Sequence, residues 1–201
     1  MSNFFSKYKY PEVPNVPKSD HGWFPKWNEE LLVPLVTNKL LIVELGSWLG
    51  KSTRYWLNNS RARVICIDTW LGSMEHQGRE DVKDKLPTLY ETFLVNQSDF
   101  KERIYPLRSS TIKGMLEVAK SSLEPDFIYI DADHSYESVF SDLTVAYSLF
   151  PDALICGDDW NWRNRNQKKR KTVQEAVKEF CKVNKKEYVN NKWAWYIKEI
   201  K

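Results

Sequence analysis

One stretch decides the fold of this chain: Val43-Glu44-Leu45-Gly46-Ser47-Trp48-Leu49-Gly50-Lys51-Ser52-Thr53. The apolar run that leads into it predicts a buried strand, and the two glycines predict a tight turn before a helix that begins near Lys51. A strand, turn and helix in this order point backbone N–H groups toward a ligand. They also leave the carboxylate of Glu44 at the end of the strand, beside that ligand.

A second apolar run, Val64 to Ile67, ends in Asp68, where an acid commonly accepts hydrogen bonds from the hydroxyls of a ribose. Dinucleotide sites instead need Gly-x-Gly-x-x-Gly, and the middle glycine of that pattern is Trp48 here. The turn is also too short for a Gly-x-x-x-x-Gly-Lys-Ser/Thr phosphate loop. The pattern therefore predicts a nucleoside cofactor without phosphate. The alternative is a strand-to-helix turn that has a structural role alone and binds no cofactor.

Strands and helices alternate after residue 40, which predicts a parallel sheet covered on both faces. The C-terminal part, with a turn at Asn190-Asn191-Lys192, predicts an antiparallel hairpin. The expected fold is α/β, a Rossmann-like, doubly wound, mostly parallel seven-stranded sheet with an antiparallel C-terminal hairpin. The expected strands are 40–45, 63–67, 103–107, 127–131, 153–156, 187–189 and 193–197, and the expected helices are 51–58, 86–96, 111–121, 136–150 and 172–183.

The overall composition fits one domain. The chain has 201 residues and a net charge of +3, too small to argue for nucleic-acid binding. Its three cysteines, Cys66, Cys156 and Cys181, give no disulfide framework. The apolar runs around Cys66 and Cys156 predict buried thiols in a reducing compartment, hence a cytoplasmic protein. No apolar stretch approaches the length of about 18 residues that suggests a membrane span.

Residues 1–39 form a separate region, rich in proline and aromatic residues, before the expected domain at 40–201. Prolines at positions 11, 14, 17 and 25 predict that residues 1–28 of this arm lack regular structure. The aromatic residues between them imply that the arm packs on something. It is either a lid over a site or a wrap around the domain, and the sequence leaves both open.

Two polar segments interrupt the alternation of strands and helices. One lies at 70–85. The other, 161–171, is strongly basic, which predicts a solvated surface or, as the lesser alternative, a contact with an anionic substrate.

Acidic residues follow two strands that we expect to be neighbours. Asp131 begins the sequence Asp-Ala-Asp-His, and the next strand runs through Gly157 into Asp158 and Asp159. Ligands of such sheets bind at the carboxyl ends of the strands. Carboxylates brought this close repel one another, so a bound cation is expected, and hard oxygen ligands favour Mg²⁺ or Mn²⁺. The alternative is a set of aspartates that cap loops.

Asp-Ala-Asp-His and Gly-Asp-Asp-Trp, one helix and one strand apart, resemble the corresponding segments of metal-dependent O-methyltransferases. The Glu-x-Gly-x-x-x-Gly turn is similar to the first motif of class I S-adenosylmethionine-dependent methyltransferases. The closest likeness is to the macrocin and novobiocin sugar O-methyltransferases, with the catechol and caffeoyl-CoA enzymes more distant. It covers residues 40–160 apart from the 72–100 insertion, and it excludes the arm and the basic segment.

The resemblance implies a role for particular residues. Asp131, Asp158 and Asp159 would hold the metal, and Asp133 would be the general base. The residues that would bind the cofactor are Glu44, Gly46, Ser47 and Gly50 at its methionine part, Asp68 at its ribose, Ser109 at its adenine, and in addition Ser52, Thr69, Trp70 and Asp131. Ser109 stands in a segment that lacks the glycine–acid pair usual in the family.

The predicted function is a Mg²⁺-dependent transfer of a methyl group from S-adenosylmethionine to a hydroxyl of a sugar or glycoconjugate. Alternatives are methylation of a catechol-like natural product and a non-catalytic nucleoside-binding module. Asp133 or His134 would remove the proton, because histidine has the ordinary pKa of a base near neutrality and Asp133 has the family likeness. The sequence leaves open whether the chain forms a homo-oligomer or is attached to a glycosyltransferase.

Overall fold

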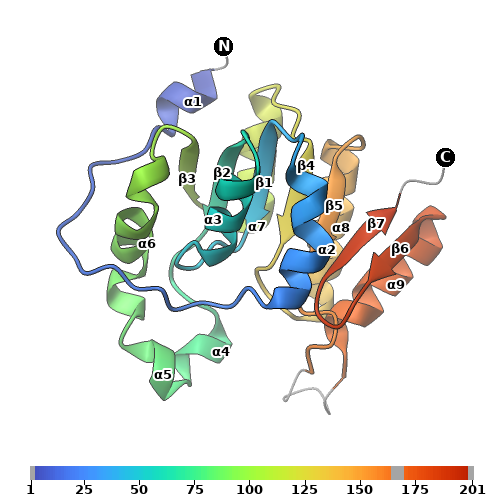
Figure 1. Cartoon of the computed structure of the whole chain (residues 1–201). Helices are drawn as coiled ribbons and strands as arrows, with labels where there is room; N and C mark the ends of the chain where they lie inside the picture. Colours follow the sequence, from blue (N-terminus) through green and yellow to red (C-terminus); the bar gives the residue numbers. More distant parts are fainter. Residues whose placement is uncertain (1–2, 164–169, 199–201) are drawn as a thin grey trace.

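A computed structural model describes residues 3–163 and 170–198. Its centre is a seven-stranded sheet in the order β3-β2-β1-β4-β5-β7-β6 (Figure 1). The strands are β1 (Leu41–Leu45), β2 (Arg63–Asp68), β3 (Ile104–Arg108), β4 (Phe127–Ile130), β5 (Leu154–Gly157), β6 (Glu187–Asn190) and β7 (Trp195–Lys198). The first five are parallel, and β7 runs antiparallel to both of its neighbours. The predicted fold class is confirmed.

The register of the central strands explains why functional residues meet at one edge. Leu45 of β1 lies opposite Ile67 of β2 and Ile130 of β4. The next residue of each strand, or of the turn after it, is therefore level with the others. This alignment brings Gly46, Asp68 and Asp131 to the same carboxyl edge of the sheet.

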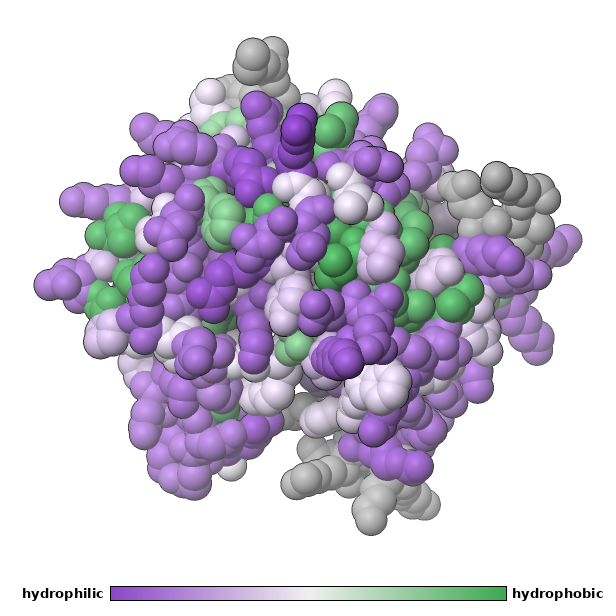
Figure 2. Space-filling view, in the orientation of Figure 1, coloured by the Kyte–Doolittle hydropathy of each residue, from purple (hydrophilic) through white to green (hydrophobic). Residues whose placement is uncertain are grey.

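Helices cover both faces of the sheet, as the alternation of elements predicts. One apolar layer lies under α2, α3 and α6, and a second lies under α7, α8 and α9. The helices are α2 (Lys26–Val36), α3 (Lys51–Asn59), α6 (Leu89–Gln97), α7 (Thr111–Lys120), α8 (Tyr136–Leu149) and α9 (Thr172–Asn184). Hydrophilic side chains cover most of the face seen in Figure 2, with hydrophobic ones in scattered groups.

Residues 8–25 of the arm have no helix or strand, as predicted, but a short helix at the beginning of the arm contradicts the prediction there. Helix α1 spans Asn3–Lys7, and α2 contains Pro34 near its end. The first three prolines of the arm lie between the two helices, and Pro25 immediately precedes α2, where a missing N–H costs nothing. The apolar side chains of Phe4 and Leu32 are buried against the domain. This burial outweighs the local tendency of the proline-rich arm to avoid helical structure. Both α1 and α2 therefore pack on the domain core.

Two element boundaries differ from the prediction for local reasons. The segment expected as one helix from residue 86 opens with a 3-10 turn, Leu86–Thr88, because Pro87 has no N–H to donate. The hairpin turn lies further along the chain than expected. The side chain of Asn191 accepts the N–H groups of Trp193 and Ala194, which closes the turn after β6 has ended.

The polar insertion after β2 holds two short helices, α4 (Met74–Gln77) and α5 (Glu80–Lys83). Figure 1 shows both at the carboxyl edge of the sheet. Within the described part of the chain, no helix has the length and apolar character needed to cross a membrane.

Asp142 of α8 is a buried carboxyl whose replacement should stabilise the fold. It is 3% exposed and accepts a hydrogen bond of 2.6 Å from the hydroxyl of Thr111. Burial raises its pKa from 3.8 to about 6, against the effect of the Thr111 hydrogen bond. The folded state therefore disfavours the charged form, and this destabilisation develops as the pH rises through the folded-state value.

We expect Asp142→Asn to raise the free energy of unfolding by about 2–3 kcal/mol near pH 8 and by almost nothing near pH 4. Urea unfolding at the two pH values measures the difference. Asp152→Asn, at an exposed carboxylate, is the matched control and should change little at either pH. An equal effect of Asp142→Asn at both pH values would contradict the explanation.

Candidate active site

A cavity of about 520 Å³ opens at the carboxyl edge of the sheet. Its walls come from the turn after β1, the ends of β4 and β5, residues 22–25 of the arm, and His76 and Arg79 of the insertion. Pockets at this edge are where doubly wound sheets bind ligands. The residues that line it include both apolar rings and carboxylates.

The turn after β1 is built around the buried carboxylate of Glu44. Its two oxygens accept hydrogen bonds from Ser47, Ser52, Thr53 and the indole of Trp56. Burial raises the pKa of Glu44, and these four donors oppose the rise. Because every acceptor position is used inside the protein, Glu44 ties the strand to α3 and does not line the cavity.

Asp68 holds the same turn from the side of β2. One of its oxygens accepts the N–H groups of Ser47 and Trp48 at 2.9 Å each, and the other accepts that of Trp70 at 2.7 Å. The ring of Trp70 is buried and its indole N–H donates to the carbonyl oxygen of Trp48. Asp68 thus shapes the turn, and its contact with a ribose stays a prediction.

The two glycines of the turn serve close packing. A Cβ at Gly46 would lie 2.1 Å from the carbonyl oxygen of Asp131, and one at Gly50 would lie 2.0 Å from the side-chain nitrogen of Gln97. Both glycines have positive φ angles, 86° and 79°. The space next to Gly50 is therefore filled by Gln97, whereas Gly46 still borders the cavity.

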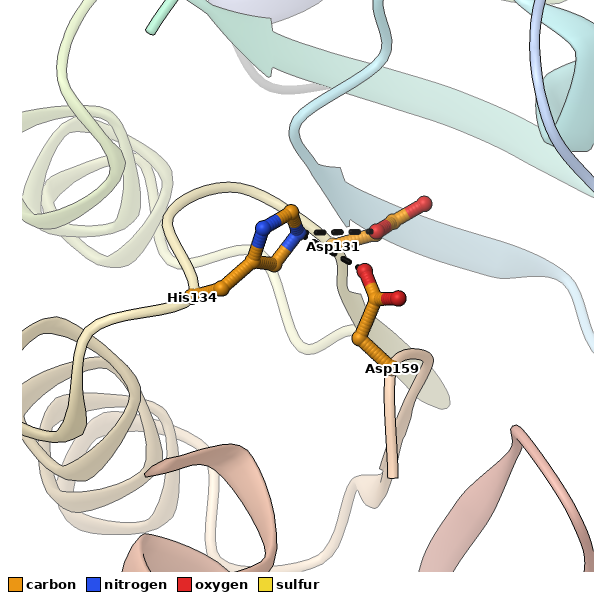
Figure 3. Close-up of side chains that lie close together, drawn as sticks. All are labelled: Asp131, His134 and Asp159. Carbon is orange, nitrogen blue, oxygen red and sulfur yellow. Dashed lines mark ion pairs between the residues drawn. The ribbon is translucent and has the colours of Figure 1, made fainter. Parts of the chain in front are cut away.

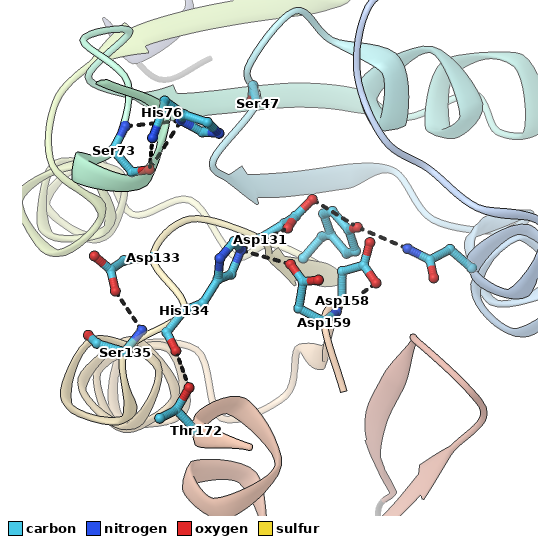
Figure 4. Close-up of polar contacts among 12 residues, drawn as sticks. Ser47, Ser73, His76, Asp131, Asp133, His134, Ser135, Asp158, Asp159 and Thr172 are labelled. Atoms are coloured by element: carbon cyan, nitrogen blue, oxygen red, sulfur yellow. Dashed lines mark hydrogen bonds and ion pairs between the residues drawn. The ribbon is translucent and has the colours of Figure 1, made fainter. Parts of the chain in front are cut away.

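Acidic side chains and one histidine meet at the floor of the cavity. His134 Nε2 lies 2.7 Å from Asp159 Oδ2 and 4.0 Å from Asp131 Oδ1 (Figure 3). Ligand atoms of these three residues all lie within 4.8 Å of one another, a spacing suited to a metal ion. Asp158 lies beside them, and one of its oxygens accepts the N–H of Asp159 at 2.6 Å (Figure 4).

Two of the carboxyl groups on the floor of the cavity are difficult to ionise. Burial, together with the nearby carboxylate of Asp159, raises the pKa of Asp131 to about 7, although the His134 hydrogen bond lowers it. Burial and the charges of Asp131 and Asp159 also raise the pKa of Asp158. Crowded buried carboxyls of this kind gain most from a bound cation.

Asp133, the residue predicted as the general base, lies outside the cavity. Its side chain is exposed and accepts the N–H of Ser135 at 2.6 Å, at the start of α8. Figure 4 shows it on the far side of the loop from Asp131. The neighbouring His134 faces the acids instead.

The arm forms part of the cavity wall. The sequence left open whether the arm lies over a site or only wraps around the domain. Its backbone at Ser19 exchanges two hydrogen bonds with the side chain of Asn96, and the carbonyl oxygen of Gly22 accepts one from Lys51 at 3.0 Å. Trp23 stacks parallel to His76, with ring centres 6.1 Å apart. Aromatic rings from the arm and the insertion thus meet over the turn.

The structure brings together only some of the predicted site residues. Of the predicted cofactor set, Gly46, Ser47, Ser52 and Asp131 line the cavity, whereas Glu44, Gly50, Asp68, Thr69, Trp70 and Ser109 do not. Ser109 borders a separate shallow groove beside Tyr90. Lys51, His76, Trp162 and Trp193 line the cavity but were not predicted as site residues. Lys51 begins α3, His76 lies in α4, Trp162 follows β5, and Trp193 lies in the turn before β7, so no single spacing in the sequence marks the set. The middle of the basic segment, 164–169, lies outside the described residues.

Comparison with known proteins identifies the class. The family described as "Methyltransferase domain" matches residues 43–160, well over half of the chain. The chain belongs to this methyltransferase family, and the prediction of a methyltransferase is confirmed. A search of curated proteins gives no significant match.

Solved structures share the fold at low sequence identity. A candidate caffeoyl-CoA O-methyltransferase from Staphylococcus aureus is 18% identical with a TM-score of 0.62, over 94% of this chain and 87% of that one. The O-methyltransferase from Bacillus cereus, in complex with SAH, is 19% identical with a TM-score of 0.56, over 90% and 84%. TomG from Streptomyces achromogenes, an O-methyltransferase of tomaymycin synthesis in complex with SAM, is 12% identical with a TM-score of 0.60, over 98% and 86%.

Proposed function

We propose that this methyltransferase transfers a methyl group from S-adenosylmethionine to a hydroxyl oxygen of a sugar or glycoconjugate, with the help of a divalent cation. The observation that carries the proposal is the group of three acids and one histidine on the floor of a cavity beside the β1 turn. In the proposal, Asp131, Asp158 and Asp159 would hold the cation, and His134 would remove the acceptor proton. Similar folds that are O-methyltransferases, two of them bound to SAH or SAM, support the choice of cofactor and of oxygen as the acceptor.

The cofactor would occupy the part of the cavity next to the β1 turn. Gly46 exposes backbone there, and the hydroxyls of Ser47 and Ser52 are held in place by Glu44. A methyl group bound to sulfonium is already electrophilic, so the protein must chiefly align the acceptor oxygen with it. The rigid turn, fixed by Glu44 and Asp68, supplies that alignment.

The cation would be held by Asp131, Asp158 and Asp159. Their oxygens are the ligands that Mg²⁺ and Mn²⁺ prefer. The raised pKa values of Asp131 and Asp158 indicate that charge on these two carboxyls is costly when no cation balances it. When bound, such an ion lowers the pKa of a hydroxyl and fixes its orientation. The donor set in this structure fits that role.

His134 is the base that the geometry favours for removing the acceptor proton. Its ring lines the cavity, and its Nε2 lies 2.7 Å from Asp159 Oδ2. The ring of Trp162 packs against it with centres 4.9 Å apart. His134 thus borders the space where the acceptor hydroxyl would lie, unlike Asp133.

A sugar acceptor fits the other half of the cavity. Trp162 and Trp193 line it next to the acids, and Trp23 closes it from the arm. Flat aromatic rings beside polar groups suit a ring that carries hydroxyls on its edge and C–H groups on its face. A methyl-transfer screen over glycans and catechols tests this choice, since exclusive turnover of catechols would replace the sugar with a phenolic acceptor.

Removal of the cation should abolish activity. We expect EDTA to stop methyl transfer and added Mg²⁺ or Mn²⁺ to restore it, because the acceptor hydroxyl then loses the charge that lowers its pKa. Transfer of radiolabelled methyl groups to the acceptor measures the effect. Full activity in EDTA would show that the acids act without a metal.

A further inference from the structure

Asn28 is a buried polar residue that reaches the acidic floor from outside the family domain. It lies in the first turn of α2, ahead of the matched segment 43–160, and is 0% exposed. Its side chain donates from Nδ2 to the hydroxyl of Tyr129 of β4. It also lies near the carboxylate of Asp158, whose pKa it lowers against the effect of burial. The cavity itself does not touch it, so it contacts the acids from behind.

The hydrogen bonds in this group have a defined direction. The Tyr129 hydroxyl donates its one proton to Asp131 Oδ2 at 3.2 Å. Its oxygen must therefore accept from Asn28, whose Nδ2 lies 3.5 Å away. An amide nitrogen has two protons, and the second is available for Asp158. One neutral side chain thus connects two of the carboxylates proposed to hold the cation.

The arrangement is costly, which argues that it has a use. The carbonyl oxygen of the Asn28 side chain is buried without a hydrogen-bond partner among the described residues. An unsatisfied buried acceptor costs about 1–3 kcal/mol, and an apolar residue at this place would avoid the cost. A leucine of similar size would fit the apolar layer around α2.

We propose that Asn28 is a positioning residue for the divalent cation: it orients Asp158 directly and Asp131 through Tyr129. The inference rests on the proposed metal dependence. It means that the N-terminal region completes the metal site of the family domain, in addition to any part it has as a lid. Residues behind metal ligands usually have such a role, and their loss typically lowers metal affinity about 10–100-fold.

Binding of Mn²⁺ to the full chain tests this, followed by the electron paramagnetic resonance signal of the free ion. We expect Asn28→Leu to raise the Kd for Mn²⁺ by about 10–100-fold. Tyr129→Phe, which keeps the ring and removes only the hydroxyl, should weaken Mn²⁺ binding in the same direction. The Kd for SAH, from calorimetry, should stay unchanged in both. Glu29→Ala, exposed on the same helix, is the control and should leave both constants unchanged.

The outcomes separate the possible failures. Wild-type affinity for Mn²⁺ in folded Asn28→Leu and Tyr129→Phe would overturn the role of Asn28 and leave metal dependence intact. An equal loss of SAH affinity would also overturn it, because Asn28 would then support the whole cavity and not the cation. Failure of the wild-type protein to bind Mn²⁺ would overturn the proposed metal dependence itself, and this inference with it.

Discussion

Replacing His134 by glutamine is expected to lower kcat by about 10²–10⁴-fold, the usual cost of removing a general base. The affinity for SAH should be nearly unchanged, because His134 lies by the acids and not in the β1 turn. Its Nε2 is 2.7 Å from Asp159, and its ring lines the cavity. Initial rates at saturating S-adenosylmethionine measure the change in kcat, and calorimetry measures the affinity for SAH.

Asp133→Asn is the matched control for this prediction. Its carboxylate accepts the N–H of Ser135, and an asparagine oxygen can accept the same hydrogen bond. We therefore expect nearly wild-type kcat from Asp133→Asn. The reverse pattern, an inactive Asp133→Asn and an active His134→Gln, would return the base to the residue that the family likeness indicated.

Gly46→Ala is expected to cause the largest loss of stability, about 3–5 kcal/mol, by combining strained backbone with overpacking. The added Cβ would lie 2.1 Å from the carbonyl oxygen of Asp131, an atom of the backbone that cannot rotate away. The φ angle of 86° also disfavours any residue with a side chain. Relief would require β1 and β4 to separate at the edge that carries the site. Urea unfolding measures the loss.

Gly78→Ala controls for the general effect of replacing glycine. A Cβ there meets nothing within 4 Å, and its φ angle of −90° is open to alanine. We expect the free energy of unfolding to change little or to rise slightly. Similar losses at both positions would mean that contact with the Asp131 backbone does not explain the effect at Gly46.

The sequence predicted the elements whose signals are local. Alternating apolar runs and helical segments predicted the five parallel strands, because each strand buries its own side chains and the connections between them contain helices. The turn near Asn190 predicted the antiparallel hairpin of the last two strands. Helix α2 was not predicted, for the opposite reason. Helix α2 contains Pro34 and precedes the regular pattern, so only the apolar surface on which Leu32 and Val36 are buried shows why it forms.

The site shows the same division. The positions of Asp131, Asp158 and Asp159 after adjacent strands followed from the sequence, because parallel strands end at one edge of a sheet. Which acid faces which partner did not follow. His134 turns toward Asp159 while Asp133 turns away, and that choice depends on the loop that leads into α8.

The sequence by itself thus determined the sheet, the turn after β1 and the gathering of acids at its carboxyl edge. These depend on residue spacing along single strands, which is a property of the chain. Only the tertiary structure decided that Glu44 and Asp68 are held inside the turn, that Trp23 and His76 form a wall, and that Asn28 lies behind the acids. The contacts of Glu44 lie within one strand–turn–helix unit, but no spacing rule says that its carboxylate turns inward. The other contacts join segments separated by tens of residues, and no local pattern selects one such partner over another.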